Sequence, residues 1–428
     1  MPAVRGLREL PQAAVGRPAP FRVTAPAYLS ALGGWLAATL LLVAAAPELA
    51  RTSVSGAAAV GAAHAVGLVF FPFAVAAAVW QLLPVMLRND PPRPALRPLT
   101  LCLLAAGVPL AISLARGHLR VAEIAAALLA AGLVLLLAEV AALIRGAPSG
   151  RMLVVSRPAV ALAGLHAAAA FALGVAVLVD GGPDPLGVAY ERLLLVHLSL
   201  ALVGWLTILI AAVGRTLVPM LGLAAAAPPR RVPLPELGIA AGLWLFVAGV
   251  AADHDALLAV GVAVMALGLS APGLLFLRVA VAGRTGWREG PVAHVAVGLV
   301  FVLQAAALAL AAAGEVVAER RAAVAGVLLL GLGWAAGVIA GHLGKLISLS
   351  GWGSWPPGPR PRQEALYPRR GWQVEVLVFA VGVETLALGI LGGWEAVARL
   401  GAALLVAAAL LALGAALETL RRVAAARP

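Results

Sequence analysis

Histidines are the residues of this chain whose chemistry stands out. Five of its 7 histidines lie inside long apolar runs: His64, His166, His197, His294 and His342. An ionisable side chain within a membrane-length apolar segment is costly to keep there and indicates a functional site by default. A neutral imidazole in a dry helical bundle is also a good axial ligand for haem iron. The alternative is a histidine that only packs and hydrogen-bonds, and the sequence leaves it open for each of them.

The depth of these histidines divides them into two groups. A helix rises 1.5 Å per residue, so His64 and His197 lie roughly 12–14 Å from the outer membrane surface. On the same scale His342 lies roughly 10–13 Å from the inner surface. His166 and His294 also fall in the inner half, because their helices start on that side. The sequence therefore predicts an outer pair and an inner group.

Small residues surround two of these histidines. His64 is set in the segment GAAHAVG and His342 in AGHLGK. Glycine and alanine would let a flat macrocycle approach the backbone, and they serve plain helix packing equally well. The other two histidines, His118 and His254, fall in loops between apolar runs, where we expect no functional role.

Helices inside a membrane must position these histidines, because the composition excludes a water-soluble fold. The 428 residues are 63% hydrophobic and 12% charged, with a mean hydropathy of +1.02. A soluble domain has roughly 45–50% apolar and about 25% charged residues. Soluble enzymes, DNA-binding modules and disordered scaffolds are therefore excluded. The sequence also has no nucleophile elbow or phosphate-binding loop, so it assigns no catalytic residue.

Twelve apolar runs are each long enough to cross a bilayer, which takes about 20 residues. They cover residues 27–47, 55–87, 98–115, 121–144, 157–179, 189–221, 235–252, 256–279, 291–313, 321–350, 373–392 and 395–420. The predicted fold is an all-α polytopic membrane protein with about twelve transmembrane helices. Residues 27–428 then form a single transmembrane domain that follows a cytoplasmic segment at 1–26 and contains a cytoplasmic loop at 351–372.

The distribution of charge predicts the orientation of these helices. The net charge is +12, and most of the 31 basic residues fall in alternate loops and in the two termini. The intervening loops near Asp184 and near Asp253 are acidic. By the positive-inside rule, this pattern places both termini in the cytoplasm and gives no nucleic-acid footprint. Abundant Arg, Ala, Gly and Pro favour a bacterial or archaeal inner membrane, with the lipid bilayer as partner.

The second and sixth runs are alike. Each has a histidine in its outer half and a proline near its inner end, His64 with Pro84 and His197 with Pro219. His342 adds a third histidine on the tenth run. Helices that are four apart run in the same direction, so the pattern predicts three parallel four-helix units rather than an inverted repeat.

Twelve helices with histidines on the second, sixth and tenth resemble subunit I of the haem-copper oxidase superfamily. The segments HLSLALVGWLTILIAAVGRTLVPML and GHLGKLISLSGW are also similar to oxidase-subunit-I-like membrane proteins of bacteria. The resemblance covers the helix count over the whole chain and individual residues only on those three helices. It implies haem b (heme b) with the axial ligands His64 and His342, and it puts His197 at the position of a copper ligand.

Several residues depart from the superfamily pattern. The seventh helix, in PELGIAAGLWLFVAGVAAD, has no histidine pair, so two copper ligands are missing. Ala201 stands four residues after His197, where the superfamily has a crosslinking tyrosine. Ala340 and Gly344 flank His342 where a second haem ligand would stand. The resemblance with these departures implies haem iron without copper and no oxygen reductase activity.

Two pairings of the haem ligands stay open. The resemblance favours His64 with His342, whereas equal depth favours His64 with His197. Ligands at opposite depths cannot share one iron unless the tenth helix is shifted or broken, and its many glycines make a break conceivable. If that helix is straight, His342 would serve an inner site together with His166 or His294.

Three other charged residues lie within apolar runs: Glu139, Arg215 and Glu384. Glu384 lies near the middle of the eleventh helix, where it is either a neutral carboxyl packed against a partner or part of a proton path. Arg215 can extend towards the inner surface, and a haem propionate is the alternative partner.

Three classes of function compete. The first is a b-type haem protein that transfers electrons or senses a gas or redox state, with a quinone or cytochrome as electron partner. The second is a proton- or metal-coupled transporter, in which the histidines and Glu384 handle ions. The third is a cofactor-free assembly subunit of a respiratory complex, and a homo-oligomer is compatible with each class. Any haem must bind non-covalently, because a chain with one cysteine, Cys102, has no C-x-x-C-H motif.

Overall fold

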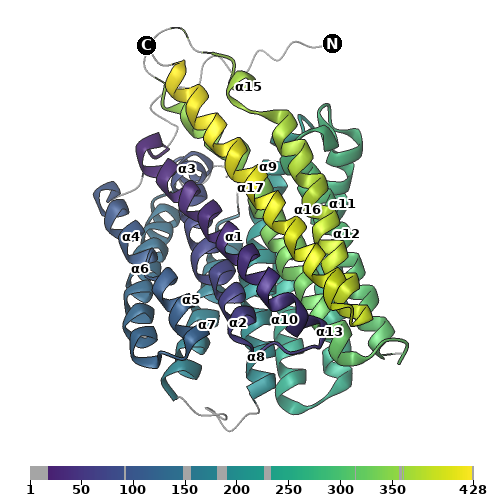
Figure 1. The fold of residues 1–428 in the computed structure, drawn as a ribbon. Coiled ribbons are helices and arrows are strands. Elements are labelled where there is room, and N and C mark those ends of the chain that lie inside the picture. Colours follow the sequence, from purple (N-terminus) through teal and green to yellow (C-terminus); the bar gives the residue numbers. More distant parts are fainter. Residues whose placement is uncertain are drawn as a thin grey trace.

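A computed structural model describes residues 18–90, 93–147, 156–180, 190–225, 233–313, 315–355, 359 and 361–426 (Figure 1). Within these residues all regular structure is helical, and no strand occurs. Twelve helical segments are long and apolar enough to cross a membrane. The prediction of an all-α polytopic protein with twelve spans is confirmed.

Several spans are divided by short irregular or π-helical stretches. The first six spans are α1 (Phe21–Ala50); α2 (Ala57–His64), η2 (Ala65–Phe70) and α3 (Phe71–Leu87); η3 (Pro94–Leu96), α4 (Arg97–Leu104) and α5 (Gly107–Arg116); α6 (Leu119–Gly146); α7 (Arg157–Asp180); and α8 (Tyr190–Ser199), η4 (Leu200–Thr207) and α9 (Ile208–Leu221). The last six are α10 (Leu234–Ala252); α11 (Asp255–Ala282); α12 (Gly290–Ala313); α13 (Glu319–Leu328), η6 (Leu329–Ala336) and α14 (Gly337–Gly353); α16 (Arg369–Gly392); and α17 (Glu395–Ala425). Two short helices, η5 (Gly286–Arg288) and α15 (Gln363–Leu366), lie in loops.

Glycine and proline mark several helix ends. Gly117 follows α5 at a φ of 72° and Gly393 follows α16 at a φ of 69°, a left-handed conformation that glycine adopts without strain. Pro20 precedes α1, which begins at Phe21 and therefore earlier than the apolar run predicts. The predicted segment 1–26 shares its last residues with this helix, and residues 1–17 lie outside the described part of the chain.

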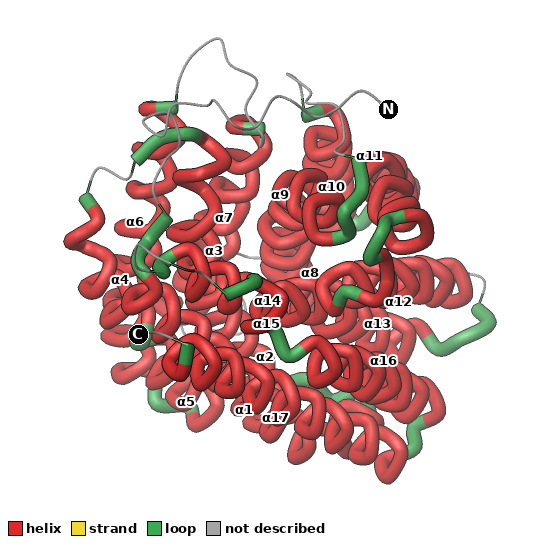
Figure 2. Tube along the Cα trace, turned by 90° about the horizontal axis from the view of Figure 1, so that it is seen from above, coloured by secondary structure: helices red, strands yellow, loops and turns green. Residues whose placement is uncertain are grey.

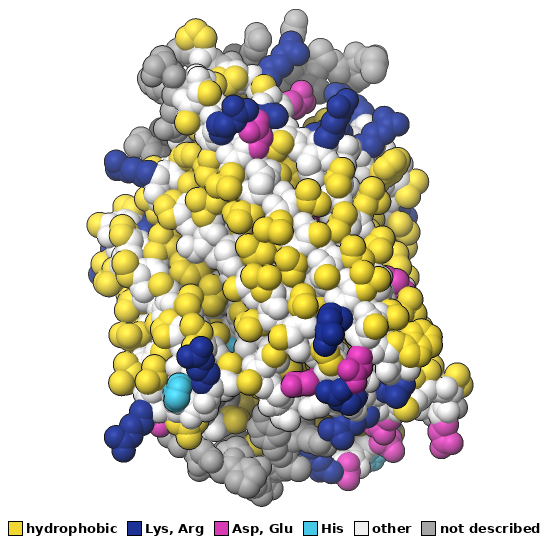
Figure 3. Space-filling model, in the orientation of Figure 1, with side chains coloured by type: hydrophobic (Ala, Val, Ile, Leu, Met, Phe, Trp, Pro, Cys, Tyr) yellow, Lys and Arg dark blue, Asp and Glu magenta, His cyan; other side chains and the backbone are white. Residues whose placement is uncertain are grey.

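The surface between the two ends of the bundle is hydrophobic. Figure 3 shows an apolar band, with most charged side chains gathered towards the two ends. Large apolar side chains in the spans are open, for example Leu267 with 74% and Leu310 with 76% of their areas exposed. Contiguous apolar surface of this kind marks contact with something other than water. These faces therefore contact lipid.

The first and last spans bring their ends together. The backbone N–H of Phe21 donates to Oγ of Ser354 at 3.0 Å, and Gly351 packs against Phe21 and Val423. The start of α1 and the ends of α14 and α17 therefore meet at one end of the molecule, at the top of Figure 1. An even number of crossings requires this arrangement. That this end faces the cytoplasm stays a prediction from the charge pattern.

The second, sixth and tenth spans share an irregularity that the sequence analysis did not predict. Each contains a π-helical segment, namely η2, η4 and η6, and no other span does so among the described residues. Such segments occur frequently at functional sites. The spans also meet, because Trp334 Nε1 in η6 donates to Thr207 Oγ1 in η4 at 3.0 Å, and the Trp205 ring in η4 packs edge-on against Phe71 in α3. Figure 2 shows α14 near the centre of the bundle.

The tenth span is continuous. It runs from Glu319 to Gly353 as one helical segment of 35 residues, with η6 as its only irregular stretch. The break that would let His342 reach the depth of His64 does not occur. The arrangement of the spans as three units like those of haem-copper oxidase subunit I remains a prediction.

Candidate functional site

The three histidines on the second, sixth and tenth spans each form a hydrogen bond from Nδ1 to a backbone carbonyl. Nδ1 of His64 donates to the carbonyl of Val60 at 2.8 Å, and Nδ1 of His342 donates to Val338 at 2.7 Å. Both acceptors lie four residues earlier on the same helix. Nδ1 of His197 donates instead to Ala170 on α7, at 3.0 Å.

These bonds determine which ring nitrogen can bind a metal. A carbonyl oxygen only accepts a hydrogen bond, so Nδ1 must carry the proton, and Nε2 of the neutral ring keeps its lone pair. Metal-binding histidines commonly donate the other ring N–H to a carbonyl or carboxylate, which sets the tautomer and the ring orientation. All three histidines are therefore prepared to offer Nε2 as a ligand.

His64 and His197 form an outer pair. His64 and His197 lie close enough that a charge on one ring would influence the other, and both side chains are partly exposed. Gly174 on α7 lies beside the His197 ring, because an added Cβ would be 3.1 Å from Cε1. Gly67 follows His64 by three residues and has open space where a Cβ would stand, with no atom within 4 Å. Gly67 therefore leaves open space about one helical turn after His64.

His342 lies apart from this pair, next to His294. The ring of His342 interacts electrostatically with His294, which is on α12. No contact joins His342 to His64 in the described part of the chain. His64 thus neighbours His197, and His342 neighbours His294. Which of these histidines bind iron stays a prediction.

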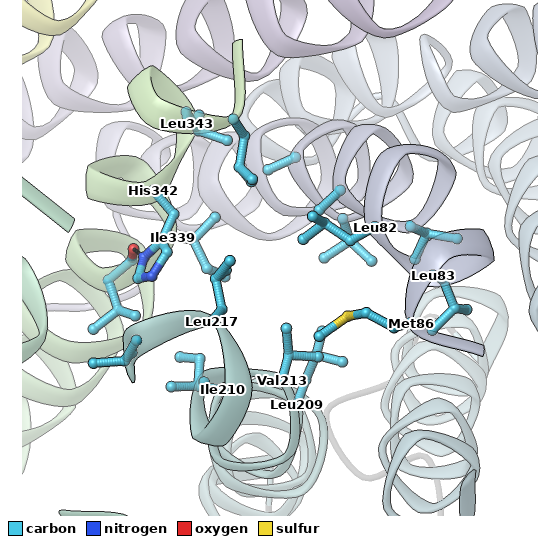
Figure 4. A pocket seen from close by; sticks show the side chains of 18 of the residues that line it. Leu82, Leu83, Met86, Leu209, Ile210, Val213, Leu217, Ile339, His342 and Leu343 are labelled. Atoms are coloured by element: carbon cyan, nitrogen blue, oxygen red, sulfur yellow. Dashed lines mark hydrogen bonds between the residues drawn. The ribbon is translucent and has the colours of Figure 1, made fainter. Parts of the chain in front are cut away.

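The ring of His342 faces an apolar cavity between the second, sixth and tenth spans (Figure 4). The cavity has a volume of about 120 Å³, and its other lining residues are apolar or glycine, among them Leu82 and Met86 on α3 and Val213 and Leu217 on α9. His342 is the only titratable side chain that lines it. A dry space of this kind accommodates a small apolar molecule beside one imidazole.

His294 is held differently. Its Nε2 bonds Oε2 of Glu375 on α16 at 2.7 Å, and neither side chain is exposed. The ring packs on Gly341 of α14, where an added Cβ would be 2.3 Å from Cδ2. Because the carboxylate engages Nε2, His294 can offer a metal only Nδ1. The sequence analysis did not single out Glu375.

Further ionic and polar groups surround this buried pair. Lys345 Nζ lies 3.4 Å from Oε2 of Glu289 and 4.5 Å from the centre of the Tyr367 ring. Arg369 approaches the other Glu289 oxygen, also at 3.4 Å. Burial, and then the charges of Glu289 and Glu375, raise the pKa of the Tyr367 phenol well above its ordinary value.

Within the described part of the chain, three buried polar atoms around this pair lack a hydrogen-bond partner: Nδ1 of His294, Oε1 of Glu375 and Nε1 of Trp372. Buried groups of this kind are normally satisfied by protein or by internal water. The region around His294 and Glu375 therefore contains a buried polar network whose groups could exchange protons. A signal was present in the sequence, because Glu289 precedes His294 by five residues at the start of an apolar run.

His166 takes part in neither group. Nδ1 donates to Leu162 at 2.8 Å, while Nε2 is buried without a partner. The ring packs on Gly204 in η4 and lies 5.9 Å from the ring of Trp244. Of the two inner candidates, it is thus His294 and not His166 that lies beside His342. The loop residues His118 and His254 are both exposed.

Each of the three buried charges named from the sequence has a protein partner. Glu139 accepts from Arg97 at 2.7 and 2.9 Å and from the Trp80 indole at 2.8 Å. Arg215 is paired with Glu236 at 3.1 Å, and Gln304 donates to Glu384 at 3.0 Å. Glu384 thus has a polar partner, and its two expected roles both stay predictions.

Comparisons with known proteins add no family to this geometry. No protein-family model matches the sequence, and no curated protein matches it significantly. The described residues also contain no group of three or more His, Cys, Asp or Glu side chains that could hold a metal ion without other ligands. The functional argument therefore depends on the histidine geometry.

Proposed function

We propose that this chain is an integral-membrane b-type haem protein that transfers electrons or senses a gas or redox state. His64 and His197 bind the haem iron from two helices, and the protein is a relative of haem-copper oxidase subunit I without its copper centre. The observation that supports this proposal is the neighbouring pair of imidazoles, each with Nδ1 held by a backbone carbonyl.

The residues around the pair fit a haem group. His64 and His197 each present Nε2 in the form that binds iron, and the open space beside Gly67 receives a flat group next to the backbone. Bound haem supplies a one-electron redox centre whose potential depends on axial ligands and burial. The carbonyls of Val60 and Ala170 hold the two rings in orientation.

His342 is a third ligand candidate in this proposal. Its free Nε2 lies beside the apolar cavity and offers a site for a small apolar molecule. Oxygen reduction is not part of the proposal, because α10 carries no histidine to complete a copper site. We expect no sustained oxygen consumption with a quinol or cytochrome c donor.

A proton-coupled transporter is the second candidate function. The observation that favours it is the buried His294–Glu375 pair with its unpartnered polar atoms. In that case the histidines exchange protons with a transported solute, and no haem is needed.

One visible absorption spectrum separates the two functions. The purified protein, oxidised and then reduced, should show a Soret band and the α and β bands of a six-coordinate b-type haem. Absence of a Soret band after expression with added haem would contradict the haem proposal and favour the transporter.

A further inference from the structure

A large cavity lies where α9 and α11 end and α10 begins. Its volume is about 770 Å³, which is within the usual range of about 300–1,000 Å³ for ligand sites. Three arginines line it: Arg215 on α9, Arg278 on α11 and Arg284 in the loop after α11. The positive-inside pattern predicts that this end of the bundle faces the cytoplasm.

The cavity has an excess of positive charge. Nη1 of Arg215 donates to Glu236 at 3.1 Å, and this fully buried carboxylate compensates that arginine. Arg278 and Arg284 are exposed, and neither forms an ion pair with a carboxylate in the described part of the chain. Apolar walls of low dielectric concentrate the field of such charges, so the cavity attracts an anion.

The loop after α11 that carries Arg284 is hydrogen-bonded to the end of α9. The backbone N–H of Thr285 donates to Gly222 at 3.3 Å, and the Thr285 hydroxyl donates to Leu221 at 3.0 Å. Gly283 lies so close to the Gly222 carbonyl that an added Cβ would be 2.7 Å from the oxygen. The backbone of Arg284 is therefore held at the cavity before any ligand binds, so this loop need not be ordered on binding.

The rest of the lining is apolar and continues onto the lipid-facing surface. Leu223, Leu274 and Val279 contribute to the walls. Along α11, Leu274 is 57% and Val281 is 78% exposed, so the cavity borders a face that contacts lipid. A small soluble anion would gain nothing from these walls, whereas a molecule with an anionic head and hydrocarbon chains would use both parts.

We propose that this cavity binds the headgroup of an anionic phospholipid. The guanidinium groups of Arg278 and Arg284 contact the phosphate, because the planar fork of arginine matches phosphate oxygens. The acyl chains lie along the exposed apolar face of α11. A zwitterionic lipid is disfavoured, because its cationic headgroup meets the excess positive charge of the site.

Lipid binding to the purified protein in neutral detergent tests this proposal. Phosphatidylglycerol and cardiolipin should stay bound in native mass spectrometry, whereas phosphatidylcholine should not. The double variant R278Q/R284Q should weaken phosphatidylglycerol binding by about tenfold or more. Both side chains are exposed, so we expect the variant to fold; Arg215 is left unchanged because its loss would strand buried Glu236.

Arg145→Gln is the matched control, since Arg145 is an exposed arginine at the end of α6, outside the cavity. It should retain wild-type lipid binding. Equal retention of phosphatidylcholine and phosphatidylglycerol, or unchanged binding by the double variant, would overturn the proposal. Inorganic phosphate should not displace the lipid at millimolar concentration, and displacement would assign the site to a soluble phosphate compound instead. These outcomes do not depend on whether haem is bound.

Discussion

The histidines of the outer pair differ from His294 in their hydrogen-bond partners. His64 and His197 each donate a hydrogen bond from Nδ1 to a backbone carbonyl, and Nε2 of each ring stays free. Nε2 of His294 forms its hydrogen bond with the carboxylate of Glu375, and Nδ1 has no hydrogen-bond partner among the described residues. The hydrogen-bond partner, rather than depth in the membrane, thus determines what an imidazole can do. The outer pair, His64 and His197, suits metal binding. The His294–Glu375 pair suits the exchange of protons.

His342 combines features of both regions. Its Nδ1 is held by a carbonyl like those of the outer pair, but its nearest imidazole is His294. The cavity before its ring offers no second nitrogen ligand. Variants at these positions can therefore show whether the two regions have separate roles.

Replacing His64 should have the largest effect. His64→Leu removes one of the two axial nitrogens, so the haem spectrum should be lost or strongly altered. His254→Leu is the control, because His254 is an exposed loop residue, and its spectrum should match the wild type. An unchanged spectrum in the His64 variant would remove the basis for the outer site.

Separate replacement of His197 and His342 sharpens the comparison. Because His197 lies beside His64 and His342 does not, only His197→Leu should convert a six-coordinate low-spin haem to a high-spin form. Absorption and electron paramagnetic resonance spectra would report the change. If His342→Leu gave the high-spin form and His197→Leu did not, the pairing implied by the family resemblance would hold instead.

Breaking the His294–Glu375 pair should affect the stability of the protein more than the haem spectrum. Glu375→Ala leaves His294 buried without its partner, and removal of one member of a buried pair costs about 3–5 kcal/mol. Thermal unfolding in detergent should show a lower Tm, while the outer haem keeps its spectrum. Glu364→Ala, at an exposed position on α15, should change neither. Loss of the haem bands in the Glu375 variant would show that the two regions are not separate.

Filling the space beside the outer pair should have the smallest effect on the fold. Gly67→Leu meets no protein atom at Cβ, so the apoprotein should fold with a Tm close to that of the wild type. Haem content should fall, because the side chain occupies the space proposed for haem. Gly33→Leu is the matched control and should keep its haem content. Gly33 also has open space at Cβ, but it lies on an exposed face of α1. Full haem content in the Gly67 variant would contradict the proposed location.

The spans were predictable because their signal is local. Length and hydropathy identify a membrane-crossing helix without knowledge of its neighbours, and all twelve spans were found in this way. Helix ends were less accurate, as the early start of α1 at Phe21 shows. The π-helical segments were not predicted, because they depend on how three spans pack at the centre of the bundle.

The buried polar residues also fall into two groups: those that the sequence reveals and those whose burial depends on helix packing. A histidine or carboxylate in the middle of an apolar run is visible in the sequence, so His64, His197 and Glu384 could be named. Glu289 and Glu375 lie near the ends of runs, where a charge is ordinarily solvated. Only the packing of α12, α14 and α16 buries them.

The sequence by itself determined the class of this protein, its twelve spans and the residue type that could bind a cofactor. The tertiary structure decided which histidines meet and which nitrogen each keeps free. A helix that is apolar on every side carries no periodic signal for the direction of its neighbours. The partner of His197, the Ala170 carbonyl on α7, therefore follows from helix packing alone, whereas the partner of His64 lies one turn earlier on its own helix.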